Sequence, residues 1–142
     1  MNAQETVDRF LNLFPEYKSA YNVHMNDYGE LLQHVFYSEV INDPLSALLK
    51  NNKETDQIKK YVGFVEDMSF QRDESVQNVV DVTILECLSD DVDVWNNLGK
   101  YISDEFRNYI NNELLKQNLC DVARKNDLME RLSLNIFFYG VF

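Results

Sequence analysis

Glycine and proline are scarce in this chain, whose 142 residues include four Gly and two Pro. A sandwich or barrel of short strands needs many tight turns, and those turns draw heavily on these two residue types. Apolar residues make up 45% of the chain and aromatic residues 13%, which is enough to bury one core. We therefore predict an all-α fold, with residues 1–142 forming one compact domain of about six or seven helices in sequential hairpins.

Apolar residues recur at helical spacing in the first half of the chain. A first helix runs through Val7 and Phe14 and should end or kink at Pro15. An irregular or helical link then leads to Tyr28. Three further helices are predicted before residue 70: one over residues 28–41 with Val35 on its apolar face, a short one over residues 44–50 capped by Asp43 ahead of Pro44, and one over residues 58–68 capped by Thr55.

The segment from Asp73 to Leu88 fits either a helix or a strand, because it is rich in β-branched residues. Its length and the cap-like Asp73 favour a helix, with an apolar stripe that includes Thr83 and Cys87. Apolar residues lie off that stripe as well, among them Val82. We therefore predict that this helix is central and packed on both flanks.

After a turn and a new cap at Ser89 to Asp91, one helix is predicted from Trp95 to Ile110 and a last one from Leu119 to Leu132. The tail, residues 132–142, is largely apolar and carries no charge. Either it packs over the core, or it is an exposed docking or dimerisation element.

Acidic residues are concentrated in one region. Residues 66–105 contain eleven acids and two bases, whereas residues 1–65 are only mildly acidic and residues 106–142 slightly basic. The whole chain has a net charge of −11. Such a surface repels nucleic acid and attracts basic proteins. The basic cluster of Lys50, Lys53, Lys59 and Lys60 is offset by neighbouring acids, so direct nucleic-acid binding is not expected.

No segment resembles a signal peptide or a membrane span, so a cytoplasmic protein without membrane contact is expected. Cys87 and Cys120 do not form a CxxC motif, and we expect both to be small core residues. Glu30 with His34, and the Asp90-Asp91-x-Asp93 run, are incomplete as metal sites. Neither a metal nor a cofactor is therefore expected. No nucleophile or phosphate-binding motif occurs, so an enzyme is not expected.

The runs Leu31 to Val40 and Asp73 to Glu86 resemble a family of small, acidic, largely uncharacterised bacterial α-helical proteins. Some members of that family resemble immunity proteins paired with secreted toxins. The resemblance covers about Tyr28 to Ile102, with Gln33 where the family pattern has Pro. It implies a helical fold and no catalytic residues.

The leading hypothesis is a stoichiometric inhibitor that neutralises a basic partner, with a nuclease toxin as the best candidate. Carboxylates would lie where the toxin binds phosphates, with two aromatic residues as anchors. The alternatives are a helical scaffold or adaptor that uses the apolar tail and, third, a carboxylate-based enzyme. The candidate partner-binding residues are Asp73, Glu74, Asp90, Asp91, Asp93, Trp95, Tyr101, Asp104 and Glu105.

Overall fold

The computed structural model describes residues 1–120, with the side chains of residues 1–113. All regular elements in that range are helical and none is a strand, so the predicted all-α fold class is confirmed. The elements in chain order are α1 (Ala3–Leu13), the 3₁₀ turn η1 (Pro15–Tyr17), α2 (Lys18–Tyr28), α3 (Gln33–Tyr37), the π turn η2 (Ser38–Asn42), α4 (Asp43–Asn51), α5 (Thr55–Ser69), α6 (Glu74–Val79), the π turn η3 (Val80–Leu85), α7 (Glu86–Ser89), α8 (Val92–Leu98) and α9 (Asp104–Cys120).

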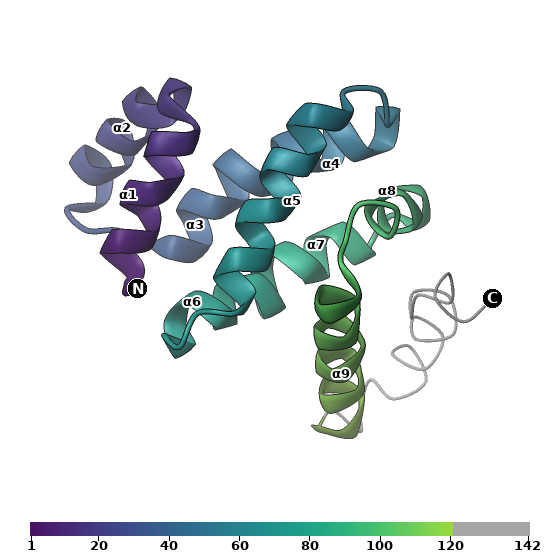
Figure 1. Ribbon diagram of the computed structural model, residues 1–142. Coiled ribbons are helices and arrows are strands. Elements are labelled where there is room, and N and C mark those ends of the chain that lie inside the picture. The colour runs from purple at the N-terminus through teal and green to yellow at the C-terminus, as the bar shows by residue number, and fades with distance from the viewer. Residues whose placement is uncertain (121–142) are drawn as a thin grey trace.

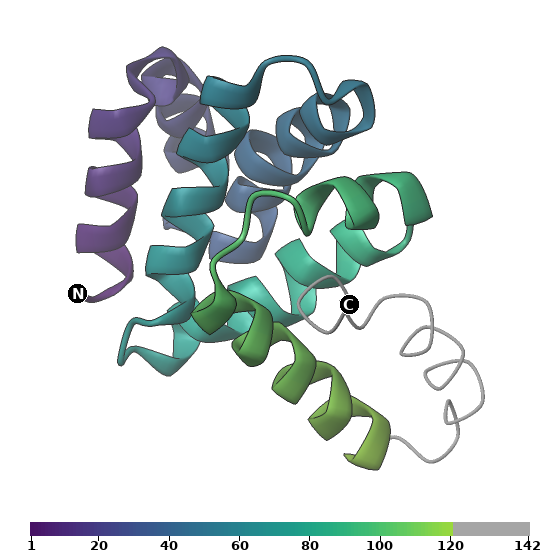
Figure 2. The ribbon, with the colours of Figure 1, turned by 45° about the vertical axis from the view of Figure 1, so that its right-hand side comes forward.

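The helices form a compact array with α5 across its middle. Helices α1 and α2 lie side by side at one end, and α8 and α9 lie toward the other (Figures 1 and 2). The N-terminal ammonium of Met1 donates to Oε1 of Gln71 at 3.0 Å, which places the start of the chain against the turn between α5 and α6. None of the described helices combines the length and the hydropathy needed to cross a bilayer.

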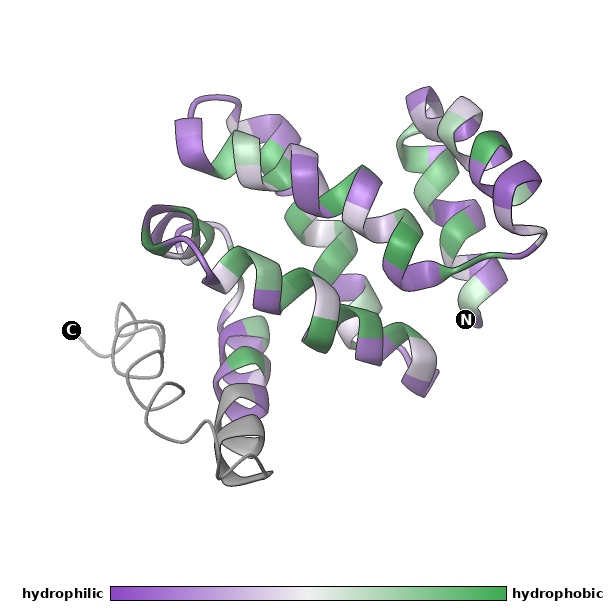
Figure 3. Ribbon diagram, turned by 180° about the vertical axis from the view of Figure 1, so that it is seen from behind, coloured by the Kyte–Doolittle hydropathy of each residue, from purple (hydrophilic) through white to green (hydrophobic). Residues whose placement is uncertain are grey.

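One apolar core runs through the array, with Trp95, Tyr37 and Tyr61 among its largest buried side chains. In Figure 3, hydrophobic residues recur along the helices between hydrophilic ones, as expected for helices that bury one side. Helix α2 is the peripheral exception, because His24 is its only buried residue. The Nε2 atom of His24 accepts the backbone N–H of Leu32 at 2.9 Å and so holds the turn that leads into α3.

Residues 33–51 form one unbroken helical run with the π turn η2 inside it. The predicted short helix over residues 44–50 exists as α4, but the prediction that Asp43 caps it is wrong, because the backbone is already helical before this residue. The backbone N–H of Asp43 instead donates to the carbonyl of Ser38, five residues earlier. Pro44 supplies the reason: in a regular helix its ring would clash with the carbonyl four residues before it, and the wider π turn relieves that crowding.

The predicted central helix also exists, as the unbroken run of residues 74–89, and it contacts α3 and α5. It contains the π turn η3, which adds one residue to a turn and shifts the buried face by about 100°. The predicted stripe is therefore partly wrong: Cys87 is exposed and Thr83 is half-buried, whereas Leu85 is buried. Val82, which was expected to pack against a second flank of this helix, is exposed, so that part of the prediction is also wrong.

The two π turns are in contact. Asn42 from η2 donates through Nδ2 to the carbonyl of Thr83 in η3 at 3.1 Å. The imidazole Nδ1 of His34 lies 2.6 Å from the hydroxyl of the same Thr83. These polar contacts fix how the two long helical runs sit against each other.

Several predicted boundaries are wrong. The run predicted over residues 28–41 starts at Gln33, because Gly29 ends α2 in a left-handed conformation, and Val35 is exposed. Glu54, not Thr55, is the N-cap of α5.

The single helix predicted from Trp95 to Ile110 is two helices. Helix α8 ends at Leu98, and α9 begins at Asp104 after a short link in which the Ser103 hydroxyl accepts the N–H of Phe106 at 3.1 Å. Beyond Leu119 and Cys120, the last predicted helix lies outside the described residues, and so does the apolar tail, residues 132–142. The side chain of Cys120 is likewise outside them.

Candidate functional site

The predicted acidic residues gather where helices begin. Asp73 is the N-cap of α6, with its carboxylate accepting the N–H of Ser75 at 2.9 Å. Asp91 caps α8 in the same way, and Asp104 and Glu105 occupy the first turn of α9. Carboxylates at these positions accept free N–H groups and complement the positive end of the helix dipole. Part of the acidic sequence signal is therefore helix capping.

An exposed aromatic ring lies among these acids at a place that we call the Phe70 corner, formed by Glu66, Phe70, Asp73, Glu74, Asp104, Glu105, Phe106 and Tyr109. Phe70 directly follows α5 and is 51% exposed. Its ring centroid lies 6.5 Å from that of Phe106 and 6.0 Å from that of Tyr109, both in edge-on geometry. Helix α9 therefore packs against one side of the Phe70 ring, and the other side is open to solvent.

Polar contacts hold the elements of the Phe70 corner together. Oε1 of Glu66 accepts the backbone N–H of Ser103 at 2.9 Å and ties the start of α9 to α5. The hydroxyl of Tyr109 donates to Asp81 of η3. Burial and the Asp81 carboxylate raise the pKa of Tyr109, so this phenol stays protonated. These contacts hold in place the part of α9 against which the exposed Phe70 ring packs.

The charge around Phe70 is mixed but mainly negative. Glu74 and Glu105 are exposed. Asp104 pairs with the largely buried guanidinium of Arg107 at 2.9 Å. The hydroxyl and backbone N–H of Ser75 hold the pKa of Asp73 below its usual range, which keeps that carboxylate ionised. Arg72 is the exposed cation in this stretch of chain.

The remaining predicted acids lie at what we call the Lys50 corner, formed by Lys50, Asp90, Asp91 and Asp93. The ammonium of Lys50 reaches Asp91 at 3.0 Å and Asp93 at 3.1 Å. It lowers the pKa of Asp91, and the two carboxylates raise the pKa of Lys50. Much of the negative charge here is therefore neutralised within the protein.

The two predicted aromatic anchors take other roles. Trp95 is fully buried, so the prediction that it anchors a partner is wrong, because no part of its ring is available at the surface. Tyr101 is half-buried, and its hydroxyl donates to Oδ1 of Asn52. Phe70 was not predicted as a site residue. The sequence does place it directly before the acids of α6, but nothing in the pattern distinguishes it from a core phenylalanine.

The described residues give little support for a metal site or for a cysteine nucleophile. No cluster of three or more His, Cys, Asp or Glu residues that could hold a metal occurs among them. Glu30 lies in the turn before α3, and so does not share a helix face with His34. Burial raises the pKa of the exposed-edge thiol of Cys87, with Asp90 and Asp43 adding to the shift, so this thiol is not activated as a nucleophile.

These features define an acidic all-α protein with an exposed, well-supported aromatic ring beside carboxylates. The chain belongs to the family described as Domain of unknown function (DUF7674), which it matches over residues 7–120. No curated protein and no solved structure matches the chain. The resemblance to toxin-immunity proteins remains a prediction.

Proposed function

We propose that this protein is a stoichiometric inhibitor that binds and neutralises a basic protein, and that the partner is a cognate nuclease toxin. The observation that carries the proposal is the Phe70 corner, where a half-exposed ring stands among carboxylates that face solvent. Aromatic anchors in such surroundings are typical centres of protein interfaces. The protein would act in the cytoplasm by binding, without a cofactor, a membrane or direct contact with nucleic acid.

The electrostatic argument starts from the partner. A nuclease cleft is positive because its substrate is negative, so an acidic surface can occupy it in place of phosphates. Glu74 and Glu105 are exposed and would meet the basic residues of the cleft. Asp73, Asp90, Asp91, Asp93 and Asp104 would add to the field that steers the encounter. Phe70 would supply the apolar contact that slows dissociation.

The proposal is tested by mixing the purified protein with the product of the neighbouring gene. We expect a one-to-one complex, loss of the nuclease activity of that product, and association that slows sharply as salt is raised. Isothermal titration and stopped-flow association at low and high salt measure these properties. A complex whose association rate and affinity do not change with salt would contradict the electrostatic mechanism.

Paired variants test whether the Phe70 corner is the docking site. The Glu74→Gln/Glu105→Gln double variant should slow association, whereas the Asp27→Asn/Glu30→Gln double variant removes two exposed acids near the end of α2 and serves as the matched control. Equal loss in both variants would mean that net charge alone matters. The Phe70 corner would then not be the docking site.

The two alternative functions have less to support them. The scaffold reading rests on the apolar tail, residues 132–142, which lies outside the described residues. The carboxylate-enzyme reading calls for two carboxylates in one pocket with perturbed pKa values. The cleft between α1 and α2 has one acid in its lining, Asp8, and a cleft between α4 and α5 also has one, Glu54.

A further inference from the structure

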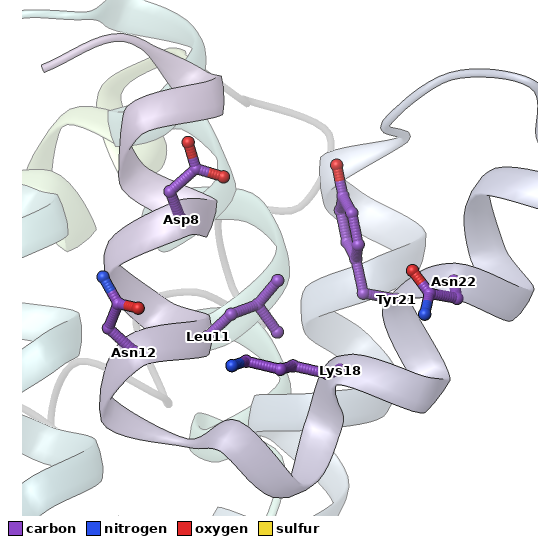
Figure 4. Close-up of a pocket in the computed structure, with 6 residues that line it drawn as sticks. All are labelled: Asp8, Leu11, Asn12, Lys18, Tyr21 and Asn22. Atoms are coloured by element: carbon purple, nitrogen blue, oxygen red, sulfur yellow. The ribbon is translucent and has the colours of Figure 1, made fainter.

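Helices α1 and α2 face each other across an open cleft of about 330 Å³ (Figure 4). Each wall contributes three residues with the spacing i, i+3 and i+4, which places them on one face of their helix. The lining residues are Asp8, Leu11 and Asn12 from α1, and Lys18, Tyr21 and Asn22 from α2.

The cleft carries opposite charges that do not neutralise each other. Asp8 and Lys18 lie on opposite walls and form no ion pair, and in Figure 4 Leu11 lies between them. Within the described residues, Lys18 makes no ion pair or side-chain hydrogen bond, and the amides of Asn12 and Asn22 have no hydrogen-bond partner. The cleft therefore presents free donors beside Lys18 and a carboxylate at its other end.

The Asp8 end is held in place by polar contacts. Nε2 of Gln4 donates to Oδ1 of Asp8 at 3.0 Å and to the hydroxyl of Tyr21 at 3.3 Å. The second carboxylate oxygen of Asp8 and a lone pair of the Tyr21 hydroxyl remain available. This end suits a ligand that donates hydrogen bonds and carries positive charge.

We propose that this cleft binds a zwitterionic small molecule of the α-amino acid class. The ligand's ammonium would bind at Asp8 and Tyr21, and its carboxylate at Lys18 with the amide of Asn12. Asp8 and Asn12 are one helical turn apart, about 5.4 Å, which suits adjacent charges of opposite sign. Leu11 and the Tyr21 ring form the apolar part of the lining and would contact the ligand's side chain.

The experiment is a titration of the isotopically labelled full chain with the standard amino acids at millimolar concentration, followed by two-dimensional NMR. Saturable shifts confined to the amides of α1 and α2 are expected for at least one amino acid. Ethylamine and propionate, which each carry one of the two charges, should bind at least about tenfold more weakly.

Variants make the result specific. Asp8→Asn and Lys18→Met should each weaken binding about tenfold, whereas Asp27→Asn and Lys59→Met, which alter exposed charges outside the cleft, should leave it unchanged. Both cleft positions are at the surface, and unchanged circular dichroism would confirm that the variants fold. Absence of saturable shifts with every amino acid would overturn the proposal, as would binding that is the same in all four variants.

Discussion

The two acidic corners look alike in sequence and differ in structure. Each combines an aromatic residue with carboxylates at a helix start. Next to the Lys50 corner, Trp95 of α8 is buried, and Lys50 bridges Asp91 and Asp93. At the Phe70 corner the aromatic ring is half-exposed, and Glu74 and Glu105 face solvent. The same residue types therefore stabilise the fold at one corner and are available for binding at the other.

The largest effect is expected from Trp95→Ala. Removing this fully buried indole should lower the free energy of unfolding by about 3–5 kcal/mol, because it leaves a large cavity in the core. Urea denaturation followed by circular dichroism measures the change. A loss below about 1 kcal/mol would mean that Trp95 is not a core residue, and the contrast between the corners would fail.

Phe70→Ala should lower affinity for the partner more than it lowers stability, unlike Trp95→Ala, whose main effect is on stability. We expect a loss of about 1 kcal/mol in stability, because the ring is only half-buried, and a loss of at least about 2 kcal/mol in affinity for the toxin partner. Val92→Ala, which truncates a 49% exposed side chain at the start of α8, is the matched control and should leave affinity unchanged. Calorimetric titration of each variant with the partner measures the change in affinity. Equal losses of affinity in Phe70→Ala and Val92→Ala would contradict the assignment of Phe70 as the anchor.

Ser103→Ala tests whether the base of the Phe70 corner is rigid. Loss of the hydroxyl that accepts the N–H of Phe106 should cost about 1 kcal/mol of unfolding free energy, a typical cap contribution. Hydrogen exchange of the first-turn amides of α9 should rise in parallel. Ser19→Ala on exposed α2 should do neither, and similar exchange in both variants would mean that the cap does not hold α9.

The smallest expected effect is a difference between the two corners in how salt changes their acid-dependent stability. The folded-state pKa values of Asp73 and Asp91 lie below the usual value, so both contribute stability that is present above about pH 4 and is lost as pH falls through their folded pKa values. The hydrogen bond from the charged Lys50 ammonium is the main cause at Asp91, whereas hydrogen bonds from the uncharged Ser75 are the main cause at Asp73.

Added salt should therefore weaken the acid-dependent contribution of Asp91 more than that of Asp73. Thermal unfolding of Asp91→Asn and Asp73→Asn between pH 2 and pH 6 at two salt concentrations measures this difference in salt response. An equal salt response in both variants would show that Lys50 does not contribute to the behaviour of Asp91.

The fold class follows from the sequence, because scarce glycine and helical periodicity act through local rules. The caps Asp73 and Asp91 were predicted for the same reason. Whether Trp95 or Phe70 is exposed depends on which helices pack around each ring, and periodicity within one helix does not contain that information. The π turns also escaped prediction, so the buried face beyond Val80 was assigned to the wrong side.

The π turn η2, whose Asn42 contacts the Thr83 carbonyl, limits how the chain tolerates insertions and deletions. Each π turn behaves as one extra residue in an otherwise regular helix, and it sets the phase of everything on one side relative to the other. Deleting one residue from η2 would produce a smoother helix, yet it would turn Phe36 and Tyr37 by about 100° out of the core. The local irregularity is thus what keeps two halves of a long helix facing the same interior.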